Sequence, residues 1–208
     1  MNRPTHILTP ISLTLVFVLL CAGCTGLQAP QVENPNLYML DARPIIAAAQ
    51  VKRDLVLAVS MPRADSGFDT PRMAYQRQPH QLDYFVSSRW ADTPPHMLEP
   101  LLTGALEQTG GFRAIVRTPG LVTANLRLDT ELLRLEQDFA TKPSRIQLTL
   151  RAQLVDVAGK RVIAVQQFEA TENAASDDAY GGVIAANRAL QRVLGELADF
   201  CVNESARP

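Results

Sequence analysis

The most restrictive feature of this sequence is a long stretch in which apolar and polar residues strictly alternate. Within residues 145–157, every second position from Ile146 to Leu154 carries an apolar side chain. Successive side chains of a β-strand point to opposite faces of a sheet, so this pattern predicts a strand with one buried face and one wet face. The turn sequence Ala158-Gly159-Lys160 and the strand-like residues 161–171 complete a hairpin. The residues expected on the wet face are Arg145, Gln147, Thr149, Arg151 and Gln153.

Two amphipathic helices are predicted to cover the buried face. The first begins at Pro94 after a cap at Asp92 or Thr93, and Gly110 ends it. The second spans residues 177–201 and carries an apolar stripe at helical spacing. These elements predict an α+β two-layer sandwich, a mostly antiparallel sheet with two amphipathic helices packed on one face.

The remaining β-structure is predicted in shorter pieces. Residues 124–136 alternate and then shift phase by one residue at Leu132-Leu133, which predicts a β-bulge. Residues 72–75 and 81–86 are expected to form a small hairpin, and residues 61–71 a loop. Three further short strands are expected at residues 37–40, 54–60 and 112–116.

The N-terminus has the pattern of a bacterial lipoprotein signal. Arg3 precedes an apolar run at residues 11–20, and the small pair Ala22-Gly23 precedes Cys24. The apolar run is too short to span a bilayer core of ~30 Å, which needs about 20 residues, so it fits a signal peptide. The pattern predicts cleavage before Cys24 and attachment of diacylglycerol to its thiol. The alternative is an ordinary secretory signal cut elsewhere, because Cys21 occupies the position where an aliphatic residue is usual.

Cleavage before Cys24 divides the chain into four expected parts. These are a signal peptide at 1–23, a lipidated tether at 24–36, a single domain at 37–201 and a tail at 202–208. Thr25 follows the cysteine, whereas Asp at that position usually retains a lipoprotein in the inner membrane. We therefore expect the domain to lie on the periplasmic face of the outer membrane.

Charge and cysteine content exclude several classes of protein. The chain has 20 Lys and Arg against 21 Asp and Glu, and removal of Arg3 leaves 19 against 21. No basic excess exists to drive nucleic-acid binding through phosphate neutralisation. With Cys21 removed and Cys24 acylated, Cys201 remains alone, so no disulfide is expected, and Cys201 is expected to be buried on a helix.

No catalytic, cofactor or metal motif is recognisable. His6 belongs to the signal peptide, and His80 and His96 lack neighbours at metal-ligand spacing. Tyr84 and Trp90 are candidates for an aromatic contact with a partner; alternatively, Trp90 packs between sheet and helix. The wet face with Arg145, Arg151 and Gln153 either binds a partner or is simply solvated.

The central block of the sequence resembles a known family. It consists of Arg72-Met73-Ala74-Tyr75, Leu82-Asp83-Tyr84-Phe85 and the stretch RWADTPPHML at residues 89–98. With Tyr38-Met39-Leu40 before it and Gly111-Phe112 after it, this block resembles the ABC-type transport auxiliary lipoprotein family, the PqiC-like proteins.

The resemblance implies a non-enzymatic accessory role. Family members look like outer-membrane components of MCE-type systems, in which an inner-membrane ABC transporter and a periplasmic MCE protein move lipid or other hydrophobic molecules. The lipid anchor carries over to Cys24, and a homo-oligomer is possible. The alternative is a structural assembly lipoprotein that braces an outer-membrane machine. A hydrolase is a third hypothesis, and it would need an activated nucleophile beside a base.

Overall fold

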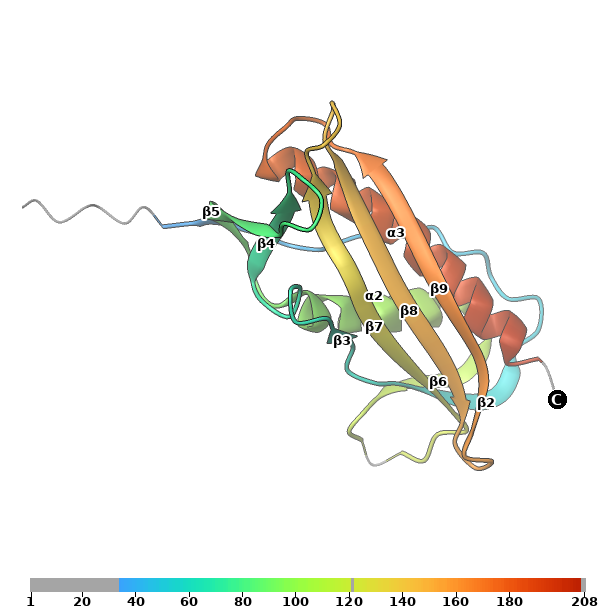
Figure 1. The fold of residues 1–208 in the computed structure, drawn as a ribbon. Helices are drawn as coiled ribbons and strands as arrows, with labels where there is room; N and C mark the ends of the chain where they lie inside the picture. Colours follow the sequence, from blue (N-terminus) through green and yellow to red (C-terminus); the bar gives the residue numbers. More distant parts are fainter. Residues whose placement is uncertain (1–33, 121, 207–208) are drawn as a thin grey trace, which may run out of the picture. The chain divides into compact units, whose positions relative to one another are not determined.

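A computed structural model of the protein describes residues 34–120 and 122–206. Residues from Pro35 onward form one compact unit. The predicted signal peptide, Cys24 and nearly all of the predicted tether lie outside the described residues. The fold of the compact unit is α+β, with a sheet of many strands and two helices (Figure 1). Its elements, in chain order, are β1 (Asn36–Tyr38), β2 (Arg53–Val59), β3 (Arg63–Ala64), β4 (Arg72–Gln76), β5 (Asp83–Trp90), α2 (Pro94–Thr109), β6 (Phe112–Arg117), β7 (Leu126–Asp138), β8 (Arg145–Asp156), β9 (Arg161–Asn173) and α3 (Ala179–Glu204).

Strand β7 organises the sheet. Along one edge it pairs antiparallel with β8 over its whole length, and β8 pairs antiparallel with β9. Along the other edge it pairs in succession with β2, β3 and β4, all in parallel. The hairpin β4–β5 extends the sheet to β1, and β2 extends it to β6. The predicted long hairpin and the predicted small hairpin are therefore both confirmed.

The expectation of a mostly antiparallel sheet is not confirmed, because the sheet is mixed. Within residues 34–120 and 122–206, five of the eight strand pairings are parallel. A parallel pair needs a crossover connection, and the chain supplies one between β2 and β6, where it passes through α2. Alternation in the sequence identifies the buried face of a strand but not the direction of its neighbour. The sheet also recruits Arg63–Ala64 as β3, inside the segment predicted to be a loop.

Several local predictions are confirmed. The register of β7 against β8 shifts between Leu132 and Arg134, where the phase shift predicted a bulge. Helix α2 has Pro94 at its first position, and Gly110 caps its C-terminus with φ of 61°. Glycine adopts this left-handed conformation without steric cost, which is why the helix stops there. Helix α3 continues to Glu204, three residues beyond its predicted end at Cys201.

The core lies between the sheet and the two helices. Leu98 of α2, Leu132 and Leu148 of the sheet, and Leu190 of α3 line one apolar space that has no room for a water molecule. Figure 1 shows both helices on the same side of strands β7–β9. On the other face of these three strands no helix lies among residues 34–120 and 122–206, and this surface positions the candidate site.

Candidate functional site

The uncovered face of β7, β8 and β9 carries rows of polar side chains that cross the three strands. We call it the outer face. In one row, Thr149 of β8 lies opposite Arg134 of β7 on one side and Glu169 of β9 on the other. Threonine is shorter than its two neighbours, so the row forms a shallow depression with a cationic wall and an anionic wall. Its volume is about 280 Å³.

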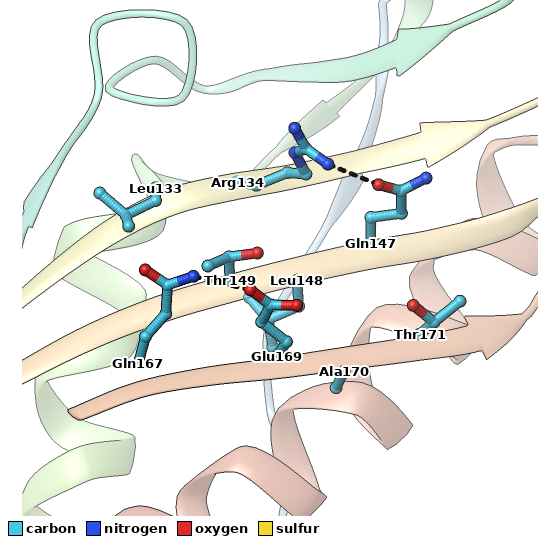
Figure 2. A pocket seen from close by; sticks show the side chains of 9 residues that line it. All are labelled: Leu133, Arg134, Gln147, Leu148, Thr149, Gln167, Glu169, Ala170 and Thr171. Atoms are coloured by element: carbon cyan, nitrogen blue, oxygen red, sulfur yellow. Dashed lines mark hydrogen bonds between the residues drawn. The ribbon is translucent and has the colours of Figure 1, made fainter.

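Hydrogen bonds hold the walls of this depression, as Figure 2 shows. Arg134 donates from Nη1 to Oε1 of Gln147 at 2.7 Å. On β9, at the other side of the depression, Nε2 of Gln167 donates to Oε1 of Glu169 at 2.6 Å. Arg134 and Glu169 therefore keep charge at the surface, and the depression can accept both donors and acceptors from a partner. Groups of this kind suit recognition of a polar surface better than enclosure of an apolar ligand.

A second depression, of about 410 Å³, adjoins the first and shares Leu133 and Arg134 with it. Its opposite wall is the turn of the β4–β5 hairpin, where His80 has φ of 67°. Glu136 lines this depression, although its side chain is only 7% exposed. The two depressions make the outer face continuous from β9 to the hairpin turn.

Two carboxylates at the end of β7 have pKa values that are shifted in opposite directions. Burial raises the pKa of Asp138, but hydrogen bonds from the Ala140 N–H, Arg145 and Gln147 together outweigh burial and leave its pKa below the ordinary value. Burial raises the pKa of Glu136 above its ordinary value, and the charge of Asp138 raises it further. Arg134 opposes this shift only partly, from 3.5 Å.

Replacing Glu136 by Gln is expected to stabilise the protein modestly at pH 7. The raised pKa means that folding disfavours the ionised carboxylate, so the wild type loses stability as pH rises through that pKa. The neutral amide removes this loss, and the difference should vanish below about pH 4, where Glu136 is protonated in both states. Denaturant unfolding at the two pH values measures it. Glu131→Gln on the same strand is the control, and equal stability of E136Q and wild type at pH 7 would contradict the argument.

The outer face includes the three wet-face residues that the sequence suggested for partner binding, but their environments differ. Arg151 and Gln153 line a third, smaller depression together with Asp129 and Arg63. Arg145 is instead engaged with Asp138, at 3.1 Å. Sequence reasoning did not single out Arg134, Gln167 or Glu169. Gln167 and Glu169 occupy the polar positions of β9 that pair with Arg151 and Thr149. Aligning the two predicted strands across their turn would therefore have identified both residues from the sequence.

The two aromatic candidates have separate environments. Trp90 is 4% exposed and belongs to the core, which agrees with the packing alternative and removes its side chain from the surface of the chain. Tyr84 is partly exposed, donates from its hydroxyl to the Gly67 carbonyl at 3.0 Å and stacks under the Arg72 guanidinium at 3.9 Å. Tyr84 therefore remains a proposed contact residue, and Trp90 does not.

The structure also shows the environments of the two histidines and the cysteine among the described residues. His80 and His96 are exposed, and His96 contacts Asp92 at 3.2 Å. Cys201 is fully buried in α3, and burial raises the pKa of its thiol. Within residues 34–120 and 122–206, His, Cys, Asp and Glu form no group that could hold a metal ion. Over the same residues, no helix has the length and apolar character needed to cross a bilayer.

The site therefore lies on the polar face of the sheet of an α+β domain. Sequence comparison defines the class of protein, because the family described as ABC-type transport auxiliary lipoprotein component matches residues 38–198. The chain belongs to this family. No functionally curated protein shows significant sequence similarity to the chain.

Solved structures share the fold. A DUF330 protein from Xanthomonas campestris superposes with a TM-score of 0.76 at 24% identity, over 82% of this chain and 97% of that one. An uncharacterized protein superposes with a TM-score of 0.64 at 13% identity, over 81% and 99% of the two chains. A hypothetical protein from Chlamydia trachomatis gives 0.53 at 10% identity, over 73% and 98%. At these identities the likenesses support the fold.

Proposed function

We propose that this protein is a non-enzymatic auxiliary subunit of an ABC/MCE-type system that moves lipid or other hydrophobic molecules across the periplasm. The observation that carries the proposal is the family match over residues 38–198, since the family consists of auxiliary lipoproteins of ABC-type transport. The protein is anchored through an acylated Cys24 in the outer membrane, with its domain in the periplasm, and its partner is an MCE-domain protein.

The outer face is the surface we propose for docking on that partner. Opposite charges lie across its strands: Glu131 of β7 pairs directly with Arg151 of β8, and Arg134 of β7 and Glu169 of β9 lie on either side of Thr149. Complementary charges fix the register of a partner and exclude surfaces of the wrong pattern. The apolar space between sheet and helices has no room for a water molecule, so this part of the core does not hold cargo. The proposed role is therefore to position the transport assembly at the membrane.

A photoreactive amino acid at Thr149 is expected to crosslink the protein to an MCE-domain component in intact cells. Thr149 forms the floor of the depression on the outer face, so a docked partner must lie within reach of it. Mass spectrometry of the crosslinked species identifies the partner. The matched control is the same amino acid at Arg188, which is exposed on α3 away from the sheet.

The crosslinking result tests the docking surface and the proposed function separately. Crosslinks to an MCE protein from Arg188 and not from Thr149 would retain the function and overturn the docking surface. Recovery of an outer-membrane assembly machine, with no transport component from either position, would instead favour the structural lipoprotein alternative.

A further inference from the structure

Exposed apolar side chains gather where the chain enters the domain. Leu37 and Met39 are 64% and 61% exposed, Tyr180 is 58% exposed and Val86 is 90% exposed. Apolar residues scattered singly over a surface are ordinary. These four flank the edge strand β1, where the chain enters the domain. Leu37 and Met39 point to one side of it, Tyr180 contacts Tyr38 on the other side, and Val86 belongs to the paired strand β5. We call these four residues the entry patch.

The fold fixes the entry patch in place. Strand β1 pairs in parallel with β5, and Asn36 lies opposite Ser88, two residues after Val86. The ring of Tyr38 contacts the ring of Tyr180 at 6.1 Å between centroids. Tyr38 and Leu40 take the inner side of the chain, so Leu37 and Met39 are turned outward.

Helix α3 prevents this segment from rotating its apolar side chains inward. Asn187 donates from Nδ2 to the Met39 carbonyl at 3.2 Å and accepts at Oδ1 from the Asp41 N–H at 2.8 Å. The two bonds clamp the backbone on either side of buried Leu40. The exposure of Met39 is therefore a property of the folded chain rather than of a loose end.

We propose that the entry patch lies against the bilayer that holds the acyl chains of Cys24; this inference rests on the proposed lipidation. From Cys24 to Pro35 the chain has 11 steps, and at ~3.3–3.6 Å per residue it spans at most about 40 Å. The patch surrounds the point where this segment joins the domain, so it is the apolar surface with the shortest path to the lipid. Apolar side chains of interfacial proteins seat in the headgroup region beside lipid anchors, and a nearby cation such as exposed Arg89 favours anionic lipid.

The test uses the full-length processed protein in vesicles of phosphatidylethanolamine and phosphatidylglycerol. Single Met39→Cys and Val86→Cys variants carry an environment-sensitive fluorophore, and both sites are exposed enough for substitution without refolding of the core. Cys24 is acylated under the proposal and Cys201 is fully buried, so neither reacts. Val165→Cys, on the outer face of β9, is the matched control.

Nitroxide lipids are expected to quench the labels at residues 39 and 86 several times more strongly than the label at 165. Protein that floats with the vesicles but shows equal quenching at all three sites would overturn the inference and leave the lipid anchor standing. Shielding from a water-soluble quencher without quenching by lipid would mean that a second copy or another protein covers the patch, which also overturns it. Protein that fails to float would overturn the anchor and the inference together.

Discussion

Replacing Cys24 by Ala is expected to stop lipid attachment and cleavage at once, so that the protein leaves the outer-membrane fraction as its uncleaved precursor. The thiol is the only group on the expected first residue that accepts diacylglycerol, and alanine has no nucleophile to replace it. Incorporation of labelled palmitate, precursor mass and density-gradient fractionation measure the three effects.

Cys201→Ala is the control for this substitution. It removes the other cysteine of the expected mature chain, but Cys201 is fully buried and acts as a small apolar side chain. This variant should keep its palmitate label and its membrane fraction and lose only some stability. A C24A protein that is still processed and recovered with the outer membrane would refute lipidation at this residue.

The sequence predicted most of the fold where the signal is local. Pro94 and Gly110 bounded α2 because the chemistry of helix ends involves a few neighbouring residues. The phase shift at Leu132-Leu133 predicted the bulge in β7 because alternation has a period of two. The alternating residues of β8 likewise assigned the buried face, and Ile146, Leu148 and Leu150 lie in the core.

Features that depend on distant partners were not predictable in the same way. The second edge of β7 is shared among β2, β3 and β4, and no local pattern specifies that order. Strand β3 has two residues, too few for periodicity to register. The candidate site was only partly predictable, because its residues come from three strands. Alternation placed Thr149 and Arg151 on a wet face, but the depression arises only when Arg134 and Glu169 are set on either side of Thr149.

Replacing Gly181 by Ala is expected to cost about 3 kcal/mol of unfolding free energy, toward the upper end of the range for overpacking. A Cβ at this position would lie 2.2 Å from the carbonyl oxygen of Ser176 and 2.5 Å from its backbone nitrogen. Backbone atoms cannot rotate away as a side chain can, so the turn before α3 must move. The same turn provides the helix cap, in which Asp178 accepts at Oδ1 from the Gly181 N–H at 2.7 Å. Denaturant unfolding measures the loss.

Two other glycines of α3 separate this steric effect from the general preference of helices for alanine. Gly195 has no neighbouring atom within 4 Å of an added Cβ, so Gly195→Ala should gain about 0.5–1 kcal/mol, the usual difference between the two residues. Gly182→Ala should be destabilising, because the Cβ would lie 2.2 Å from Oε1 of buried Gln137. That clash is with a side chain, so a second substitution, Gln137→Ala, should cost less in the G182A protein than in the wild type, whereas it should not relieve G181A. If G182A is as stable as the wild type, the close approach of α3 to the end of β7 is wrong.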